Sequence, residues 1–261
     1  MPMHARVSVR TDIAKYAAFI SLLFCSVGCV GTSIAVLRVE SAVVVSADSL
    51  VLDLKGVRST ECKISESGSG FFALAGTADY GGTGIATFDA NKIARQVSKE
   101  KTLKERADAF RRIALPGFRT AVEDMRRNVP ARFNKGVSLQ AIFFGIEGGI
   151  AASQVETFSV TLEKGEIVVK PERFACPDPG KCDAGFLNTQ LLGVNDAAKA
   201  AAGPIKDGGL IDGHNLAESS RQLVALEEKD APSYVGGPIV SVVIQVSKPV
   251  VWIDPSHVCG H

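Results

Sequence analysis

Two apolar, β-branched runs open the main part of the chain, Thr32–Val39 and Ala42–Ala47. Only Glu40 and Ser41 separate them, so the pattern predicts a β-hairpin, although the connection lacks the Asn-Gly or Gly-Gly pair of the strongest hairpin signals. Residues 70–75 predict another strand. The glycines that follow this strand predict a loop whose backbone is able to approach another group closely.

Helical spacing extends over residues 83–128, where apolar residues recur every three or four positions. Pro116 and Gly117 interrupt the pattern, so two or more helices are predicted, with a break at these two residues. The arginine pairs 111–112 and 126–127 lie on the predicted helices. A solvated helix face explains these pairs more simply than a binding patch does.

The remainder of the chain consists of strands, then helices, then a last strand. Strands are predicted at 139–145, 151–162, 167–170 and 239–246, with 250–253 as an extension of the last, and helices at 193–202 and 215–228. Strands and helices grouped in blocks favour packed layers over a parallel βαβ sheet. The fold class expected is therefore α+β, a four-layer αββα sandwich in which helices cover the outer faces of two antiparallel sheets.

The N-terminal segment has the composition of a signal peptide. Three basic residues, Arg6, Arg10 and Lys15, precede an apolar run at 16–30. That run ends in small residues. The run is shorter than the roughly 20 residues of a spanning helix. We expect a signal peptide or propeptide at 1–31, one domain at 32–261, and export to the periplasm or beyond the cell. A retained membrane anchor and a lipid-modified Cys29 stay open as alternatives, although Ser26 stands where lipoprotein signals usually have Leu.

Four cysteines lie beyond residue 31, an even number that permits full pairing in an oxidising compartment. Cys176 and Cys182 flank two prolines and a glycine, which favours a local disulfide. Cys62 pairing with Cys259 is the favoured arrangement of the other two, though spacing alone does not fix connectivity. A metal site at the first pair or in the tail at 257–261 is the weaker alternative, since no second closely spaced Cys or His pair accompanies the first.

Charge and known motifs exclude several function classes. Lys and Arg number 29 against 28 Asp and Glu, which gives no reason to expect a nucleic-acid partner. The chain has no G-x-S-x-G elbow, phosphate-binding loop, zinc-binding H-E-x-x-H or dinucleotide fingerprint, and no cofactor is expected. Of four histidines, only His214 lies mid-chain, in a Gly-Asp turn typical of a surface position. A nucleophile that needs no histidine is therefore favoured.

Residues 32–49 resemble the start of mature proteasome β-subunits and of related bacterial protease cores. In that family, cleavage after a Gly exposes an N-terminal Thr, a hairpin follows, and Asp-Ser ends the second strand. Here Gly31 precedes Thr32, and Asp48-Ser49 stands at the matching interval. The resemblance implies an N-terminal-nucleophile hydrolase, with a ring-forming homo-oligomer as a further expectation.

Three later segments continue the resemblance. Lys63 looks like the family's lysine at the start of the next strand, one residue early, and residues 75–79 are similar to its Ala-Gly loop. Residues 230–237 resemble its Asp-x-x-Ser-Gly-Gly motif, with two extra residues between Ser233 and Gly236, so that Val235 is an alternative occupant of the serine's place. Gly193-Val194-Asn195 replaces the family's Gly-Ser-Gly, which leaves that serine's role unfilled or passed to Asn195.

The resemblance implies a role for each matching residue. Thr32 would be the nucleophile and its own α-amine, with a reference pKa of roughly 7.7–8.0, the base. Lys63 would lower the pKa of that amine, and Asp48 would hold Lys63. The N–H of Gly76 would stabilise the oxyanion, an effect worth roughly 3–4 kcal/mol. The amine and hydroxyl would be oriented by Asp230 and Ser233.

The expected substrate is a peptide or a small amide, which nothing in the sequence distinguishes. A non-catalytic structural or binding subunit, like proteasome α-subunits, is the competing hypothesis from another class. Contact with a membrane is expected only through the N-terminal segment, if it is retained.

Overall fold

The computed structural model describes residues 32–52, 58–81, 87–183, 187–205 and 215–260. The predicted signal segment at 1–31 lies outside these residues, as do His214 and His261. No helix among the described residues is both long and apolar enough to cross a membrane.

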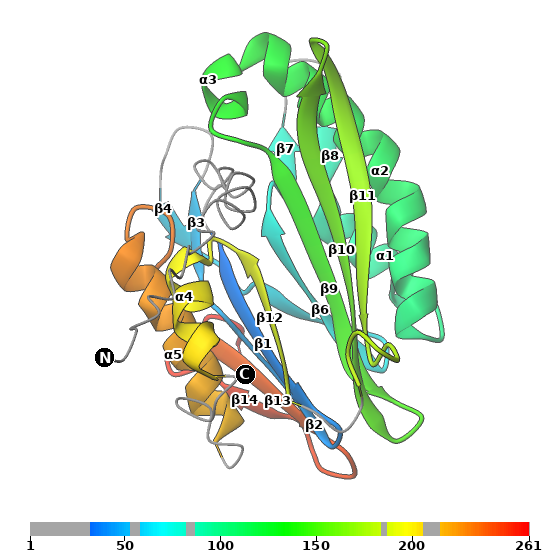
Figure 1. The fold of residues 1–261 in the computed structure, drawn as a ribbon, viewed down its shortest axis with the longest axis vertical. Helices are drawn as coiled ribbons and strands as arrows, with labels where there is room; N and C mark the ends of the chain where they lie inside the picture. The colour runs from blue at the N-terminus through cyan, green and yellow to red at the C-terminus, as the bar shows by residue number, and fades with distance from the viewer. Residues whose placement is uncertain (1–31, 53–57, 82–86, 184–186, 206–214, 261) are drawn as a thin grey trace, which may run out of the picture.

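The first large sheet contains the predicted hairpin. Its order is β12 (Asn188–Gly193), β1 (Ser33–Val39), β2 (Ala42–Ala47), β13 (Val240–Gln245) and β14 (Val251–Ile253), all antiparallel (Figure 1). Successive residues of β1 point to opposite faces, and both faces are buried, which explains why most of its positions are apolar. Residues 250–253 do not extend the preceding strand, because β14 turns back and pairs with it.

The second large sheet is built from longer strands. Its order is β11 (Glu166–Cys176), β10 (Ile150–Glu163), β9 (Ser138–Glu147), β6 (Gly70–Gly76) and β5 (Ile64–Ser67), again antiparallel. The predicted strands at 70–75, 139–145 and 151–162 are present, and the short one at 167–170 is part of the longer β11.

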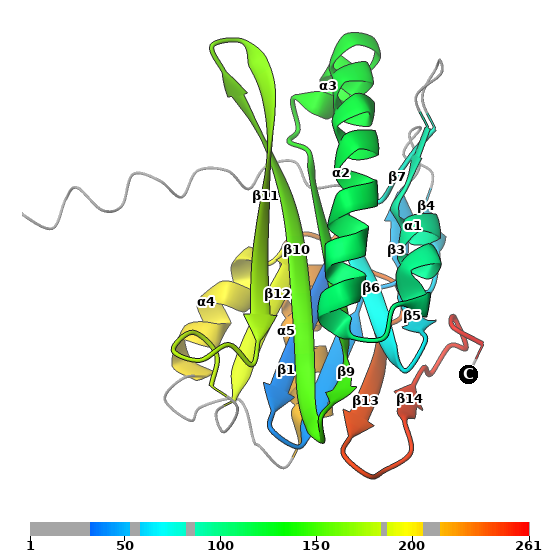
Figure 2. The ribbon, with the colours of Figure 1, turned by 90° about the vertical axis from the view of Figure 1, so that its right-hand side faces the viewer.

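Strand β8 (Thr87–Asp89) is connected to β9 by helices α1 (Ala90–Gln96), η2 (Val97–Lys99), α2 (Leu103–Asn128) and α3 (Pro130–Phe133). Thr102 caps α2 in a capping box with Glu105, and α2 runs along β9 and β10 (Figure 2). The predicted break at Pro116 and Gly117 is wrong, since α2 passes through both residues. Its apolar face is buried continuously on both sides of Pro116, and this packing outweighs the proline's lost hydrogen bond.

Helices α4 (Asp196–Ile205) and α5 (Leu216–Asp230) follow β12 and match the two helices predicted in this region. Asn215 caps the N-terminus of α5, and its side chain accepts a hydrogen bond from the N–H of Glu218. It packs against β1 and β2. Leu223 and Val224 of α5 share a buried cluster with Ala35 and Leu37 of β1.

The expected four-layer αββα sandwich is wrong. Within the described ranges the strands form four antiparallel sheets where two were expected, because β3 (Leu50–Leu52) pairs with β4 (Arg58–Thr60) and β7 (Asp79–Gly81) pairs with β8 (Thr87–Asp89). Strand residues also outnumber helical ones. These three-residue strands carry no periodic apolar signal, so their pairing was not predictable from the pattern. The fold is mostly antiparallel β-sheet with packed helices.

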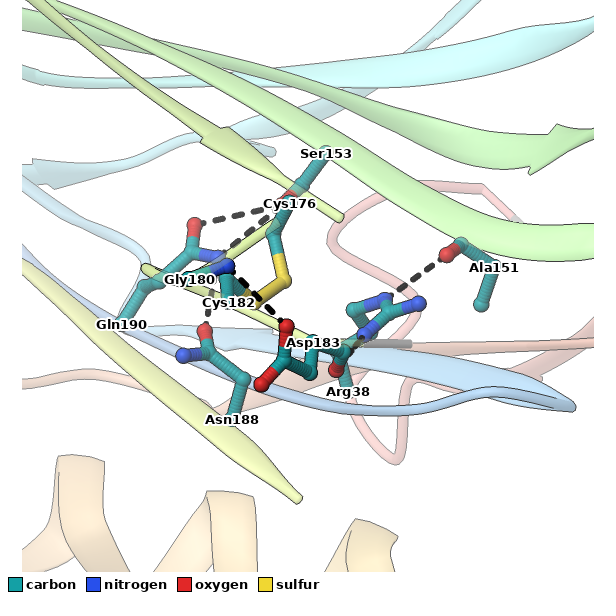
Figure 3. The surroundings of a disulfide bond; sticks show 9 residues. All are labelled: Arg38, Ala151, Ser153, Cys176, Gly180, Cys182, Asp183, Asn188 and Gln190. Atoms are coloured by element: carbon teal, nitrogen blue, oxygen red, sulfur yellow. Dashed lines mark hydrogen bonds between the residues drawn. A yellow bond between two sulfur atoms is a disulfide. The ribbon is translucent and has the colours of Figure 1, made fainter. Parts of the chain in front are cut away.

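Both predicted disulfides are present, Cys62–Cys259 and Cys176–Cys182. The second lies beside Arg38 of β1, whose guanidinium donates to the carbonyl oxygens of Ala151 and Asp183 (Figure 3). Cys259 is thereby removed as a metal ligand in the tail. Two disulfides are compatible with an oxidising location outside the cytoplasm.

Candidate active site

The predicted residues Thr32 and Asp48 lie at the same end of the first large sheet. Thr32 directly precedes β1 and Asp48 directly follows β2, and Ile34 in β1 lies opposite Ala47 in β2. Gly193, the last residue of β12, pairs with Ser33 on the other side of β1 at this end. The pairing of β1 with β2 therefore brings Asp48 close to the backbone after Thr32, although Ser33 and Asp48 are 15 positions apart in the sequence.

Asp48 is the centre of a buried hydrogen-bond network. Lys63 donates its ammonium to both carboxylate oxygens at 3.0 Å, and the side chains are only 7% and 1% exposed for Lys63 and Asp48. Oδ1 also accepts the backbone N–H of Ser33 at 2.7 Å, and Oδ2 accepts that of Gly236 at 3.3 Å. The N–H of Ser33 belongs to the peptide bond that joins Thr32 to Ser33. The Oδ1 atom of Asp48 therefore links the Lys63 ammonium to the backbone of Thr32.

Asp48 and Lys63 come from different large sheets. Asp48 follows β2 in the first sheet, and Lys63 directly precedes β5 in the second. Burial lowers the pKa of the Lys63 ammonium, and the Asp48 charge opposes this shift. Burial likewise raises the pKa of the Asp48 carboxyl against the attraction of Lys63. The two shifts narrow the gap between the pKa values, so Lys63 holds its proton less firmly than an exposed lysine does.

Thr32 is buried and held by its backbone carbonyl. That oxygen accepts the N–H of Val194 at 2.8 Å, just past the end of β12. Gly193 is in the left-handed region at φ +79°, and a Cβ placed there would lie 1.8 Å from the Thr32 oxygen. Only glycine fits at this position, because any side chain would displace the Thr32 carbonyl.

Gly76 ends β6 close to this point. The Cβ position built on Gly193 lies 3.3 Å from the Cβ of Ala75, so the end of β6 borders the backbone of Thr32. Gly76 has φ +84°, and a Cβ there would lie 2.3 Å from the carbonyl oxygen of Ser138. The structure therefore brings Asp48 and Lys63 to the backbone that follows Thr32, and it places Ala75, the residue before Gly76, beside the Gly193 that contacts the Thr32 carbonyl.

The C-terminal motif contributes its glycines to this site. Gly236 donates to Asp48 and accepts the N–H of Leu50 at 2.9 Å, and Gly237 takes φ +77° against Ser49. These contacts clamp the segment before β13 onto the residues that follow β2.

The two polar residues of the same motif lie elsewhere. Asp230 is exposed at the end of α5, and Ser233 is exposed in the turn after it, whereas Val235 is buried. The hydrogen bonds described above for Asp48 and Lys63 involve neither Asp230 nor Ser233. Asn195 is buried, but its amide donates to the Leu191 carbonyl at 3.1 Å and so secures the turn before α4.

Gln140 is a site-supporting residue that the sequence did not predict. It lies in β9, and its Oε1 accepts the N–H of Gly193 at 2.7 Å. Gln140 thereby ties the end of β12 to the second large sheet. The one available signal was a polar residue inside the apolar strand at 139–145.

The comparisons with known proteins leave the family open. No protein-family model matches the chain, and no curated protein matches it. Among solved structures it is similar to "Anbu from Hyphomicrobium sp. strain MC1", with a TM-score of 0.44 and 16% identity over 86% of this chain and 88% of that one. A likeness at this level assigns neither family nor activity, so the function proposed below rests on the geometry of the site.

Proposed function

We propose that the protein is an exported hydrolase of amide bonds, most simply a peptidase, that uses Thr32 as its N-terminal nucleophile once the Gly31–Thr32 bond is cut. The observation that carries the proposal is the buried Asp48–Lys63 pair, one oxygen of which also accepts the N–H that follows Thr32. A buried ion pair is costly to keep, and ionisable groups with shifted pKa values cluster at functional sites.

The chemistry needs a base beside a weak nucleophile. The free α-amine of Thr32 would take the hydroxyl proton as the oxygen attacks the substrate carbonyl carbon. The C–N bond then breaks, the leaving amine receives that proton, and water hydrolyses the resulting ester to regenerate Thr32. Lys63 favours the neutral form of the α-amine by charge repulsion, and Asp48 keeps Lys63 in place.

The developing oxyanion requires a nearby donor. We assign this role to the backbone N–H of Gly76, because the end of β6 borders the Thr32 backbone. The left-handed conformations of Gly76 and Gly193 hold both strand ends in their close approach to neighbouring carbonyl oxygens.

A second candidate function is a non-catalytic structural or binding subunit. The exposed positions of Asp230 and Ser233 favour it, since their predicted task is to orient the amine and hydroxyl of Thr32. The same proposal covers a small amide as substrate in place of a peptide. It also covers a homo-oligomeric assembly.

Covalent labelling distinguishes these functions. The protein starting at Thr32 should form one adduct with a β-lactone electrophile and hydrolyse a fluorogenic peptide or amide. Thr32→Ala should lose both reactions and keep its circular dichroism spectrum, whereas Thr32→Ser, which keeps a hydroxyl, should retain measurable labelling. Undiminished labelling of Thr32→Ala would place the nucleophile elsewhere. A wild-type protein that begins at Thr32 and stays unlabelled would favour the non-catalytic subunit.

A further inference from the structure

The Asp48–Lys63 pair bridges the two large sheets, so its geometry depends on how firmly those sheets are held together at this edge. Asp48 extends from β2 and Lys63 from β5, the last strand of the second sheet. The backbone N–H of Glu61 donates to the carbonyl oxygen of Ser49 at 2.9 Å, which joins the segment before Lys63 to the segment after Asp48. A second link, closer to Lys63 itself, restricts the distance between the two side chains further.

The Cys62–Cys259 disulfide provides such a link. Cys62 is the residue directly before Lys63, and Cys259 follows β14, the last strand of the first sheet. The disulfide therefore joins the segment before β5 to the segment after β14 covalently, one residue from Lys63. Phe71 of β6 and Trp252 of β14 pack edge to face at 5.8 Å between ring centroids, which adds a contact between the same two sheets.

The tail that carries Cys259 is itself rigidly held. Asp254, which directly follows β14, is buried, and its carboxylate accepts the N–H groups of Val258 at 2.9 Å and Cys259 at 2.6 Å. The sulfur of Cys259 thus lies at a fixed point relative to the first sheet. Through the disulfide, the backbone before Lys63 is tied to that same sheet.

We propose that the Cys62–Cys259 disulfide is a positioning device for Lys63, which sets the ammonium against Asp48 and completes the site only when the two cysteines are joined. The inference rests on the proposed function in assigning Lys63 a part in Thr32 chemistry. A dithiol reductant would reverse the device: the S–S bond breaks to two thiols as the reductant closes its own disulfide.

The chain contains a matched control. Cys176–Cys182 lies near Arg38, six residues along β1 from Thr32, a separation of roughly 20 Å for an extended strand (Figure 3). Loss of this disulfide removes a covalent link of the same chemistry without touching either residue of the ion pair.

Two paired variants test the proposal in the protein that begins at Thr32. In C62S/C259S, hydrogen exchange of the Ser33 and Gly236 amides, which both donate to Asp48, should accelerate about tenfold or more. The maximal rate of β-lactone labelling should fall about tenfold or more, while the concentration for half-maximal rate stays within about twofold. C176S/C182S should match the wild type in both measurements.

A reduction experiment keeps the test valid if C62S/C259S does not fold. Folded C176S/C182S treated with dithiothreitol should lose Ser33 and Gly236 protection and labelling rate, and reoxidation should restore both. Unchanged exchange at Ser33 and Gly236 after confirmed reduction of Cys62–Cys259 would overturn the proposal. The exchange measurements decide this even if the wild type never labels, so failure of the proposed function is distinguishable from failure of the disulfide's role.

Discussion

At the scale of single residues, the central feature is a pair of opposite charges, Asp48 and Lys63, buried beside the start of β1, just after Thr32. Breaking a buried pair leaves one uncompensated charge. An exposed pair on the β10–β11 hairpin, Lys170 with Glu163, is about half exposed on both sides and offers a natural comparison.

Lys63→Met should therefore lower the free energy of unfolding by about 3–5 kcal/mol, because Asp48 stays buried without its partner. The double variant D48N/K63M should recover much of that loss while remaining unlabelled by a β-lactone. Denaturant unfolding and labelling separate the two effects.

The comparison variant is Lys170→Met, which should change stability by no more than about 1 kcal/mol. Equal losses in Lys63→Met and Lys170→Met would contradict the central position given to the buried pair. Full labelling of D48N/K63M would remove Lys63 from the chemistry.

A second prediction concerns Tyr80, whose hydroxyl donates to Asp124 at 2.7 Å. Burial, that hydrogen bond and the nearby carboxylate raise the pKa of Tyr80 to about 12. Between about pH 10 and about 12 the unfolded chain loses a proton that the folded chain keeps, so stability falls as pH rises, by at most about 1.4 kcal/mol per pH unit.

Denaturant unfolding at pH 10 and 11 checks this for the wild type and Tyr80→Phe. The stability advantage of the wild type over Tyr80→Phe should shrink at the higher pH. A constant difference would mean that Tyr80 titrates alike in both states.

At the scale of elements, the site depends on strand ends that meet at one edge. Gly193 at the end of β12 is the most constrained of these, because its Cβ would collide with the Thr32 carbonyl oxygen. Gly149, in the turn between β9 and β10, has a similar φ of +82° with nothing within 4 Å of its Cβ position.

Gly193→Ala should therefore abolish β-lactone labelling, because Thr32 must move. Gly149→Ala should cost only the backbone strain of about 1–2 kcal/mol and label at the wild-type rate. Thermal unfolding and labelling rates measure both effects, and equal labelling of the two variants would show that Thr32 tolerates the displacement.

The sequence predicts elements well where one physical signal dominates. The hairpin at 32–47 and the helix at 215–228 follow from apolar periodicity, and both disulfides were favoured from the even cysteine count and the spacing around two prolines. The predicted helix break at Pro116 is wrong because tertiary packing of a long apolar face outweighs the local cost of a proline. The four-layer sandwich failed because short ribbons such as β7–β8 form without periodicity.

The candidate site was predictable only in part. Asp48 and Lys63 were named from the resemblance, and the structure places them in contact. Gln140 was missed because its role depends on a hydrogen bond between strands of different sheets, which leaves no local pattern. Asp230 and Ser233 belong to the motif whose Gly236 donates to Asp48, but both of their side chains are exposed. Their predicted roles stay predictions.

At the scale of the whole molecule, the two disulfides differ in the length of chain they close. Cys62 and Cys259 are 197 residues apart, and Cys176 and Cys182 only 6. By the loop-closure entropy of the unfolded chain, loss of the first should lower stability by about 5 kcal/mol and loss of the second by about 2 kcal/mol.

Denaturant midpoints of C62S/C259S and C176S/C182S measure this difference. A larger loss in C176S/C182S would indicate that native contacts around Arg38 outweigh loop closure.

The whole account depends on whether Thr32 becomes the first residue of the working protein. The most direct measurement is the mass of the intact protein purified from its native compartment, followed by sequencing of its N-terminal peptide after reaction with a β-lactone. We predict a chain that begins at Thr32 and carries one adduct on that residue. A native chain that begins at any other residue, or an adduct on any other side chain, would contradict the assignment of Thr32 as the N-terminal nucleophile.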